Sequence, residues 1–257
     1  MQKVILVTGG ASGIGAATAR LAAAAGYHVA INYHSRETEA AALVGEIGRR
    51  GGRAVAIAAD VAQEADIARL FAQTEQALGP VSALVNSAGI GGSASQVADF
   101  DAREIDRLFT INVVGLMLCC REAARRMSTR RGGAGGAIVN VSSMAGTIGG
   151  RAGKSHYAAS KAAVDSFTVG FAKEVAAEGI RVNAIRPGVT RTDMTAESLA
   201  HPERRADIEA TIPMRRAGEA DEIARAILWL LSDEASFISG ARLDASGGGF
   251  IIGRPVS

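Results

Sequence analysis

The chain has 257 residues, a formal net charge of +2 and two cysteines. Hydrophobic residues make up 48% of it but aromatic residues only 4%, so the core must consist mainly of Ala, Val, Ile and Leu packed between layers. This composition is typical of one α/β domain with a large central sheet, and we expect a single domain over residues 1–257. The near-neutral charge, with arginines interspersed among acidic residues, argues against a nucleic-acid partner.

The first ten residues, MQKVILVTGG, contain no long apolar run after a basic segment. No window of the chain reaches the roughly 20 apolar residues that span a bilayer, so the sequence predicts a cytoplasmic protein with no membrane partner. Cys119 and Cys120 are adjacent, where a bridge between them would be strained, and we expect both to be reduced packing residues. The four histidines show no metal-ligand spacing, so no metal site is expected.

Short β-branched runs alternate with longer helical patterns, which predicts right-handed βαβ crossovers and a doubly wound α/β fold, a seven-stranded parallel sheet with helices on both faces. The expected strands are Lys3–Thr8, His28–Asn32, Arg53–Ala58, Ala83–Asn86, Gly136–Ser142, Arg181–Arg186 and Ala241–Asp244. The clearest expected helices are Gly13–Ala25, which ends at a capping Gly26, and the longer Arg103–Met127 and Ser155–Ala177.

The stretch from Thr190 to Gly218 has little continuous periodicity, two prolines and several charges. These features predict a long, partly helical loop, and loops of this length often act as lids over a site. We therefore expect a substrate lid at about residues 190–218.

The run Thr8–Gly15, TGGASGIG, follows the first expected strand and opens the first expected helix. Glycines in that context let a pyrophosphate approach the main chain while helix N-terminal amides point at it. The pattern therefore indicates a nucleotide site. Its spacing is G-x-x-x-G-x-G rather than G-x-G-x-x-G, and a tight turn without a ligand is the alternative interpretation.

Tyr157 and Lys161 begin the helix expected after the fifth strand, and their four-residue spacing puts them on one helical face. An ammonium beside a phenol stabilises the phenolate and lowers a phenol pKa that is normally about 10. Ser142 and Ser143 end the fifth expected strand at its carboxyl edge, where ligands bind in open α/β sheets. A Tyr and a Lys at this spacing also occur by chance on solvated helices, and the spacing alone therefore indicates little. Their position directly after the fifth expected strand is what makes them catalytic candidates.

Further motifs follow along the chain in a fixed order. Together with those above, they are Gly9, Gly13 and Gly15, Asp60-Val61, Asn86-Ser87-Ala88-Gly89, Asn112, Ser143, Tyr157 with Lys161, Pro187-Gly188 and Gly247-Gly248. In order and spacing, these motifs resemble the short-chain dehydrogenase/reductase family along nearly the whole chain, with similarity to NADP-using glucose dehydrogenase-like and ketoacyl reductase-like members. The resemblance implies a Rossmann fold and an NAD(P)(H)-dependent oxidoreductase acting on a carbonyl or secondary alcohol.

The resemblance implies four catalytic residues. Tyr157 would give a proton to the carbonyl oxygen as hydride leaves the nicotinamide ring, acting as general acid and, in reverse, as base. Ser143 would orient and polarise that oxygen, and Lys161 would hold the nicotinamide ribose and lower the tyrosine pKa. Asn112 would help anchor a proton-relay water, with helix packing as the alternative role.

The resemblance also implies a cofactor site spread over the ends of several strands. Asp60 would accept a hydrogen bond from the adenine amino group, with Val61 against the ring. Asn86 would line the adenosine ribose and tie neighbouring strands together, while Val189 and Thr192 would contact the nicotinamide amide and the phosphates. The full candidate set is Gly9, Ala11, Ser12, Gly13, Ile14, Gly15, Tyr33, Ser35, Arg36, Asp60, Val61, Asn86, Ala88, Gly89, Tyr157, Lys161, Pro187, Gly188, Val189 and Thr192.

Two departures from the family pattern affect individual residues. The family's Asn-Asn-Ala-Gly has Ser87 at its second position here, a small polar exchange that we expect to matter little. Ser143 and Tyr157 are 14 residues apart, one more than in many relatives. The longer spacing leaves Ser142 as the alternative to Ser143, which we choose because it is the second serine of the pair.

The end of the second expected strand reads INYHSR, residues 31–36, with no carboxylate before Glu37. NAD-preferring sites carry an acidic residue there, which holds both ribose hydroxyls and repels a 2′-phosphate. Ser35 and Arg36 are able instead to hydrogen-bond a phosphate, which favours NADP(H). Ser12 stands where many NADP users carry a second basic residue, so use of NAD(H) stays open. A solvated Arg36 at a helix start is the alternative interpretation.

Substrate identity is not decided by the fold class. Apolar lid residues, together with residues 149–156 on the opposite side, predict a mixed substrate pocket. The apolar lid residues are Met194, Leu199, Ile208 and Met214. Arginines of the lid favour an acidic substrate only if they are not simply solvated; they are Arg191, Arg204, Arg205, Arg215 and Arg216.

The two longest expected helices carry apolar residues on more than one face, which predicts helix-on-helix contact between subunits. The resemblance implies a homotetramer or homodimer. The residues concerned are Leu108, Ile111, Val114, Leu118, Phe167, Val169 and Phe171. The rival hypothesis is a catalytically silent nucleotide-sensing or scaffold protein of the same fold, against which the complete set of four catalytic candidates argues.

Overall fold

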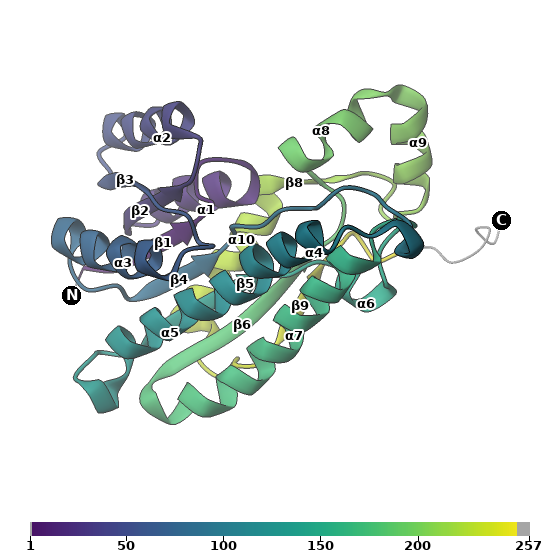
Figure 1. Cartoon of the computed structure of the whole chain (residues 1–257). Coiled ribbons are helices and arrows are strands. Elements are labelled where there is room, and N and C mark those ends of the chain that lie inside the picture. Colours follow the sequence, from purple (N-terminus) through teal and green to yellow (C-terminus); the bar gives the residue numbers. More distant parts are fainter. Residues whose placement is uncertain (1, 251–257) are drawn as a thin grey trace.

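The computed structural model describes residues 2–250, which form a seven-stranded sheet in the order β3-β2-β1-β4-β5-β6-β9, with every strand pair parallel (Figure 1). The strands are β1 (Val4–Thr8), β2 (His28–Tyr33), β3 (Ala54–Ala58), β4 (Ala83–Asn86), β5 (Gly136–Val141), β6 (Ile180–Pro187) and β9 (Arg242–Ala245). All seven predicted strands are therefore confirmed, and each end lies within one residue of its predicted position.

Helices cover both faces of this sheet, which confirms the doubly wound fold. The helices are α1 (Gly13–Ala24), α2 (Glu37–Arg49), α3 (Glu64–Leu78), α4 (Ala102–Phe109), α5 (Leu116–Met127), α6 (Ala145–Ile148), α7 (Ser155–Val175), α8 (Asp193–Ala200), α9 (Pro202–Ala210) and α10 (Ala220–Leu231). One apolar core lies between the sheet and helices α3, α5 and α7, and the other between the sheet and helices α1, α2 and α10.

Strand β1 shows why the sheet reads as continuous apolar runs. Its side chains alternate between the two cores: Val4 and Leu6 pack in the first, whereas Ile5 and Val7 pack in the second. All four are at most 1% exposed. A strand buried on both faces needs an apolar residue at every position, because successive side chains point to opposite faces.

The prediction of one continuous helix at Arg103–Met127 is wrong. The structure divides it into α4, a π-helical segment at Thr110–Gly115, and α5. A π-helical turn adds a residue and changes which side chains face inward, and here Asn112 is buried at 1% exposure. A Cβ atom on Gly115 would lie 2.3 Å from the carbonyl oxygen of Val61. The sequence pattern misses the break because the apolar periodicity continues through it.

Two other helix predictions hold. The helix expected at Ser155–Ala177 is α7, which ends at Val175 and continues as a single 3-10 turn. After α1, Gly26 has a φ of +87° and its N–H donates to the carbonyl of Ala23 at 3.0 Å, as expected for a C-terminal cap. No helix among residues 2–250 is long and apolar enough to cross a membrane.

The segment expected to be a lid is partly helical, as predicted. It contains α8 and α9 between two short parallel strands, β7 (Thr190–Arg191) and β8 (Gly218–Glu219). Its buried residues Leu199, Ile208, Ile212 and Ala217 form a small apolar cluster of their own. Its action as a lid stays a prediction.

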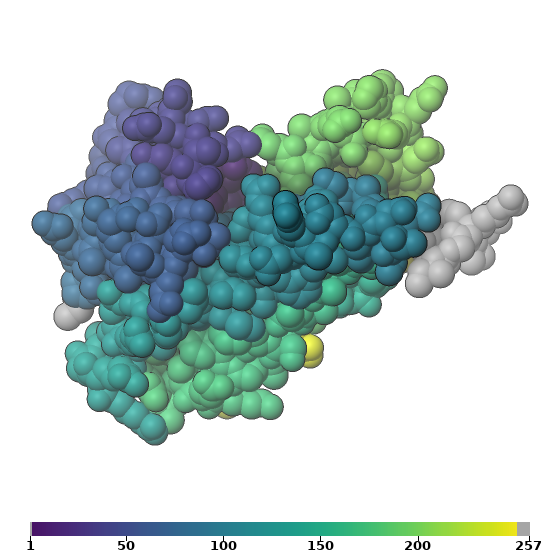
Figure 2. Space-filling view, in the orientation of Figure 1, coloured from purple at the N-terminus to yellow at the C-terminus, as the bar shows by residue number. Residues whose placement is uncertain are grey.

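The space-filling view shows a notch between the purple and blue N-terminal part, which includes α1 and α2, and the light-green α8 and α9 (Figure 2). The notch lies at the carboxyl side of the sheet, where β1 and β4 are neighbours. The chain leaves β1 towards one face and β4 towards the other, since α1 and α5 belong to different cores. Such a change in winding direction opens a ligand crevice in doubly wound sheets.

We predict that Gly115→Ala destabilises the protein by about 1–3 kcal/mol, because the added methyl group overlaps the backbone at Val61. The matched control is Gly45→Ala in the middle of α2, where a Cβ would meet only the end of the Arg49 side chain at 3.4 Å. That variant should gain about 0.5–1 kcal/mol from higher helix propensity. Thermal unfolding of both variants at one protein concentration measures the difference, and equal effects would contradict the close approach.

Candidate functional site

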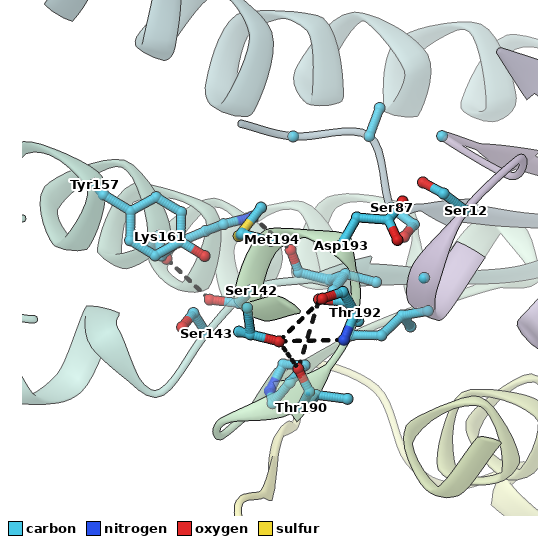
Figure 3. Close-up of a pocket in the computed structure, with 18 of the residues that line it drawn as sticks. Ser12, Ser87, Ser142, Ser143, Tyr157, Lys161, Thr190, Thr192, Asp193 and Met194 are labelled. Carbon is cyan, nitrogen blue, oxygen red and sulfur yellow. Dashed lines mark hydrogen bonds between the residues drawn. The ribbon is translucent and has the colours of Figure 1, made fainter. Parts of the chain in front are cut away.

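A cleft of about 220 Å³ opens at the carboxyl edge of the sheet, between the turn after β1 and the segment before α8. In Figure 3, Tyr157, Lys161, Ser142 and Ser143 lie together at one end of it, and Ser12 and Ser87 lie at the other. The cleft is lined by Gly9, Ser12, Gly13, Ile14, Ser87, Ala88, Gly89, Val141, Ser142, Ser143, Tyr157, Lys161, Pro187, Gly188, Thr190, Thr192, Asp193, Met194 and Thr195.

The glycine turn after β1 is tightly folded against its neighbours. A Cβ on Gly15 would lie 2.2 Å from the carbonyl oxygen of Gly9, and one on Gly9 would lie 2.8 Å from Cα of Ala88. Ser12 is the N-cap of α1 but its side chain makes no capping hydrogen bond, and the first turn of the helix has no acidic residue. The first amides of α1 therefore lack both an intrahelical acceptor and a side-chain cap, which suits a phosphate group.

Two polar side chains that the sequence analysis did not single out hold this turn in place. The Asn32 Oδ1 atom accepts from the Gly9 N–H at 3.2 Å, and its Nδ2 donates to the Ala59 carbonyl at 3.0 Å. The Thr8 hydroxyl accepts from the N–H groups of Ser87 and Ala88 at 3.1 and 3.2 Å. The sequence did contain a sign of this role, because Thr8 and Asn32 are polar residues at the ends of otherwise apolar strands, and buried polar groups require hydrogen-bond partners.

The end of the cleft that contains Tyr157 and Lys161 is built from β5 and α7. Ser143 follows β5, and its Oγ accepts from the Ala145 N–H at 3.1 Å. Ser142 donates its hydroxyl hydrogen to the Lys161 carbonyl at 3.1 Å. Ser142 is thus committed to the helix backbone, whereas Ser143 lines both this cleft and the cavity beside it. The geometry favours Ser143 over Ser142 as the residue in contact with substrate.

Lys161 is a buried cation. Its side chain is packed between β5 and α7 at 6% exposure, and Nζ donates to the Val141 carbonyl at 2.9 Å. Burial lowers the pKa of Lys161 to about 8, and the negative charge of Asp165 opposes that shift. One turn further along α7, Asp165 is itself paired with Arg186, with Nε and Oδ2 3.1 Å apart.

The pKa of Tyr157 shifts in the direction opposite to the one expected from its neighbour Lys161. In the structure burial raises the pKa of Tyr157, and the hydrogen bond with Ser143 opposes that rise. Lys161 does lie nearby, with Nζ 5.8 Å from the centre of the phenol ring. However, Nζ faces the Val141 carbonyl, and because burial lowers the lysine pKa to about 8, the ammonium is partly deprotonated near that pH. The Tyr157 hydroxyl is thus in its neutral, proton-donating form near pH 7.

Asn112, from the π-helical segment, fixes the chain that follows β4. Its Oδ1 accepts from the Ile90 N–H at 2.8 Å and its Nδ2 donates to the Ile90 carbonyl at 2.9 Å. Nδ2 also lies 3.2 Å from the Ser160 hydroxyl, which belongs to α7. A Cβ on Gly89 would lie 3.2 Å from the Asn112 oxygen and 3.6 Å from Lys161 Nζ. Asn112 therefore lies next to the lysine, behind the cleft wall.

A second cavity, of about 280 Å³, adjoins the cleft on the side of α8. The two linings share Ser143, Tyr157, Pro187, Gly188, Met194 and Thr195. The apolar residues of the second cavity are Met144, Ala145, Ile148, Pro187, Val189, Met194, Leu199, Ile208 and Phe250, and its charged residues are Arg151 and Lys154. Met194, Leu199 and Ile208 were expected here from the sequence, whereas Met214 is not part of this lining.

Several cofactor candidates lie outside the cleft lining. Asp60 accepts from the Ala62 N–H at 2.9 Å, and Val61 is 7% exposed behind Gly115. The Asn86 side chain is buried and donates to Asn140 Oδ1 at 2.9 Å, which ties β4 to β5 as expected. The remaining candidates outside the lining are Ala11, Gly15, Tyr33, Ser35, Arg36 and, in the second cavity, Val189.

Known proteins similar to this chain agree with the geometry. A family model described as enoyl-(acyl carrier protein) reductase matches residues 9–249. The uncharacterized oxidoreductase YgfF of Escherichia coli (strain K12) is 46% identical over 245 residues, covering 95% of this chain and 99% of the relative. The 3-oxoacyl-[acyl-carrier-protein] reductase of Mus musculus is 40% identical over 248 residues, covering 96% and 98%.

The chain belongs to the short-chain dehydrogenase/reductase family. This short-chain dehydrogenase/reductase also matches solved structures. A short chain dehydrogenase from Burkholderia cenocepacia J2315 in complex with NADP has a TM-score of 0.88 at 36% identity, covering 96% of this chain and 97% of that one. A dehydrogenase/reductase from Sinorhizobium meliloti 1021 has a TM-score of 0.87 at 35% identity, covering 96% and 94%. The predicted NAD(P)(H)-dependent oxidoreductase function is confirmed at this level.

We predict a pH-dependent contribution of Lys161 to the free energy of unfolding. Between about pH 8 and pH 10.5, the unfolded lysine binds a proton that the folded one has lost. Unfolding therefore takes up a proton, and this contribution to stability rises with pH across that window by on the order of 3 kcal/mol. Below pH 8 the full cost of burying the charge remains.

Denaturant unfolding at several pH values tests this. The Lys161→Met variant should lack the rise that the unmodified protein shows between pH 8 and pH 10.5. Lys173→Met, an exposed substitution on the same helix, should keep it. The same pH dependence in all three proteins would show that burial does not lower the pKa of Lys161.

Proposed function

We propose that this short-chain dehydrogenase/reductase is an NADP(H)-preferring enzyme that interconverts a carbonyl and a secondary alcohol, with Tyr157 as the general acid and base. The observation that carries the proposal is the wall shared by the two cavities, which contains both Ser143 and Tyr157. A cofactor in the glycine-lined cleft and a substrate in the apolar cavity would meet at these two hydroxyl groups.

The residues of the cleft fit the cofactor, since the phosphate-binding turn is pressed against the loop after β4 and the amides of α1 are uncapped. The turn and Thr192 would hold the pyrophosphate, and Lys161 would hold the nicotinamide ribose. When bound, the nicotinamide supplies or accepts the hydride.

The chain's own residues would carry out the proton transfer. The raised pKa keeps Tyr157 protonated at neutral pH, so it is ready to donate to the carbonyl oxygen. Ser143 would donate a second hydrogen bond to that oxygen and hold it in line with the phenol. Asn112, which anchors Ile90 beside Lys161, would position the water that returns a proton to Tyr157.

The preference for NADP(H) rests on the region after β2. Ser35 and Arg36 follow this strand, and no carboxylate precedes Glu37. Arg36 is 44% exposed at its side chain and starts α2, so its guanidinium is accessible to a 2′-phosphate. The similar Burkholderia cenocepacia enzyme was solved with NADP. NAD(H) remains the second candidate because position 12 is a serine.

The proposed substrate is a carbonyl compound with an apolar body, because most side chains in the second cavity are apolar. Among similar proteins are 3-oxoacyl-[acyl-carrier-protein] reductases and the 3beta-hydroxysteroid dehydrogenase 1 of Eggerthella lenta, whose named substrates have this character. The rival hypothesis, a catalytically silent sensor or scaffold, is not favoured, because the chain's relatives are oxidoreductases.

We also propose a homotetramer or homodimer, located in the cytoplasm. Of the helix residues that suggested an interface, Leu108 and Phe171 are buried within the chain itself, whereas Val114 is 47% exposed. Trp229 on α10 and Phe237 beside the edge strand β9 are also exposed. Large apolar side chains left in solvent on these elements support contact with a second subunit.

Tyr157→Phe should reduce turnover by at least about 100-fold, because it removes the transferable proton while keeping the ring. Cofactor binding, followed by nicotinamide fluorescence, should stay within about twofold, since the change deletes one hydroxyl group. The matched control is Tyr27→Phe, at the opposite edge of the sheet, which should leave turnover unchanged. If Tyr157→Phe kept most of its activity on a panel of carbonyls, the acid/base assignment would be wrong.

Arg36→Gln should weaken NADPH binding about tenfold and leave NADH binding nearly unchanged, because a charge-assisted bond to phosphate contributes about 1.5 kcal/mol or more. Fluorescence titration with each dinucleotide measures both affinities. Arg49→Gln, at the other end of α2, controls for the loss of a positive charge from the same helix. Equal weakening of both dinucleotides would remove Arg36 as the determinant of preference.

A further inference from the structure

An ion pair joins two parts of the molecule that are distant in sequence. Arg36, the N-cap residue of α2, places Nη1 2.5 Å from Oδ2 of Asp193, the first residue of α8. The two residues are separated by 157 positions. Arg36 thus precedes α2 in the N-terminal part of the chain, whereas Asp193 begins the segment expected to act as a lid; the space-filling view shows a notch between the surfaces of these two parts (Figure 2).

The position of Asp193 does not depend on this ion pair alone. Thr192 and Thr195 form a capping box, in which the Thr192 N–H donates to the Thr195 hydroxyl at 3.2 Å. Thr192 also packs close to the phosphate-binding turn, since a Cβ on Gly13 would lie 3.2 Å from its methyl group. Asp193 is therefore fixed at the rim of the cofactor cleft, which it helps to line (Figure 3).

The carboxylate occupies a donor of the group proposed to read the cofactor. Arg36 faces two acidic side chains, Asp193 at 2.5 Å and, more distantly, Glu39 at 3.9 Å. The guanidinium fork matches a carboxylate and a phosphate equally well. A 2′-phosphate that bound Arg36 would have to share its donors with Asp193 or displace it.

We infer that Asp193 is a determinant of cofactor choice carried by the lid, because its carboxylate competes with the 2′-phosphate of NADP(H) for Arg36. This inference rests on the proposed role of Arg36 in binding that phosphate. NADP(H) then separates α8 from α2, whereas NAD(H), which lacks the phosphate, leaves the ion pair intact. The competition makes the preference for NADP(H) over NAD(H) smaller than Arg36 alone would produce. It also means that the ion pair between α2 and the start of α8 is present or absent according to which dinucleotide is bound.

A double-mutant cycle on Arg36 and Asp193 tests the competition. NADPH and NADH affinities are measured by nicotinamide fluorescence for the unmodified protein, Asp193→Asn, Arg36→Gln and the double variant. Asp193→Asn should raise the ratio of NADPH to NADH affinity about threefold, the scale of one exposed ion pair. In the Arg36→Gln background the same substitution should leave the ratio unchanged, because no guanidinium remains to be released.

Glu39→Gln is the matched control, since it removes an equal charge farther from Arg36, and its effect on the ratio should be smaller than that of Asp193→Asn. Circular dichroism confirms that each variant folds. An unchanged ratio in Asp193→Asn, or an equal rise in the Arg36→Gln background, would overturn the inference and leave the NADP(H) preference standing. A ratio unaffected by Arg36→Gln alone would overturn the proposed role of Arg36 in binding the 2′-phosphate and, with it, the inference.

Discussion

The parallel pairing of β1 with β4 is the constraint on which the site depends. Their register matches Thr8 with Asn86, so both strands end at the same level and their following loops meet. The Thr8 hydroxyl accepts two amides of the β4 loop, and Gly9 packs directly on Ala88. From there Ile90 reaches Asn112, which lies beside Lys161. Residues as distant in sequence as Thr8 and Lys161 are thus connected through one strand pair.

The end of the cleft that contains Tyr157 also contains a charge that the fold must tolerate. Lys161 is buried next to Val141, and burial lowers its pKa to about 8. An ammonium kept in such a place is costly unless hydrogen bonds and a nearby negative charge offset the loss of water. The Val141 carbonyl and Asp165 provide these. Functional sites commonly keep groups of this kind at the expense of stability.

The segment from β7 to β8 contributes to the walls of both cavities. Its side chains Met194 and Thr195 line both cavities, and Leu199 and Ile208 belong both to its own small core and to the second cavity. Leu199 and Ile208 thus both stabilise this segment and shape the wall of the second cavity. Substitutions there would change the shape of that cavity and the stability of α8 and α9 together, because the same side chains serve both.

The sequence by itself determined the seven strands, their parallel direction, the doubly wound fold and the candidate catalytic residues. Buried parallel strands require unbroken apolar runs, and the glycine turn, Ser143, Tyr157 and Lys161 occupy fixed positions just after such runs. Only the tertiary structure decided the π-helical break at Thr110–Gly115, the support of the turn by Asn32 and the pairing of Arg36 with Asp193. Each of these depends on contacts between segments remote in the chain, which local periodicity does not encode. The same reason applies to Tyr157: its position after the fifth strand, four residues before Lys161, made it a candidate, but the direction of its pKa shift is set by its burial in the fold.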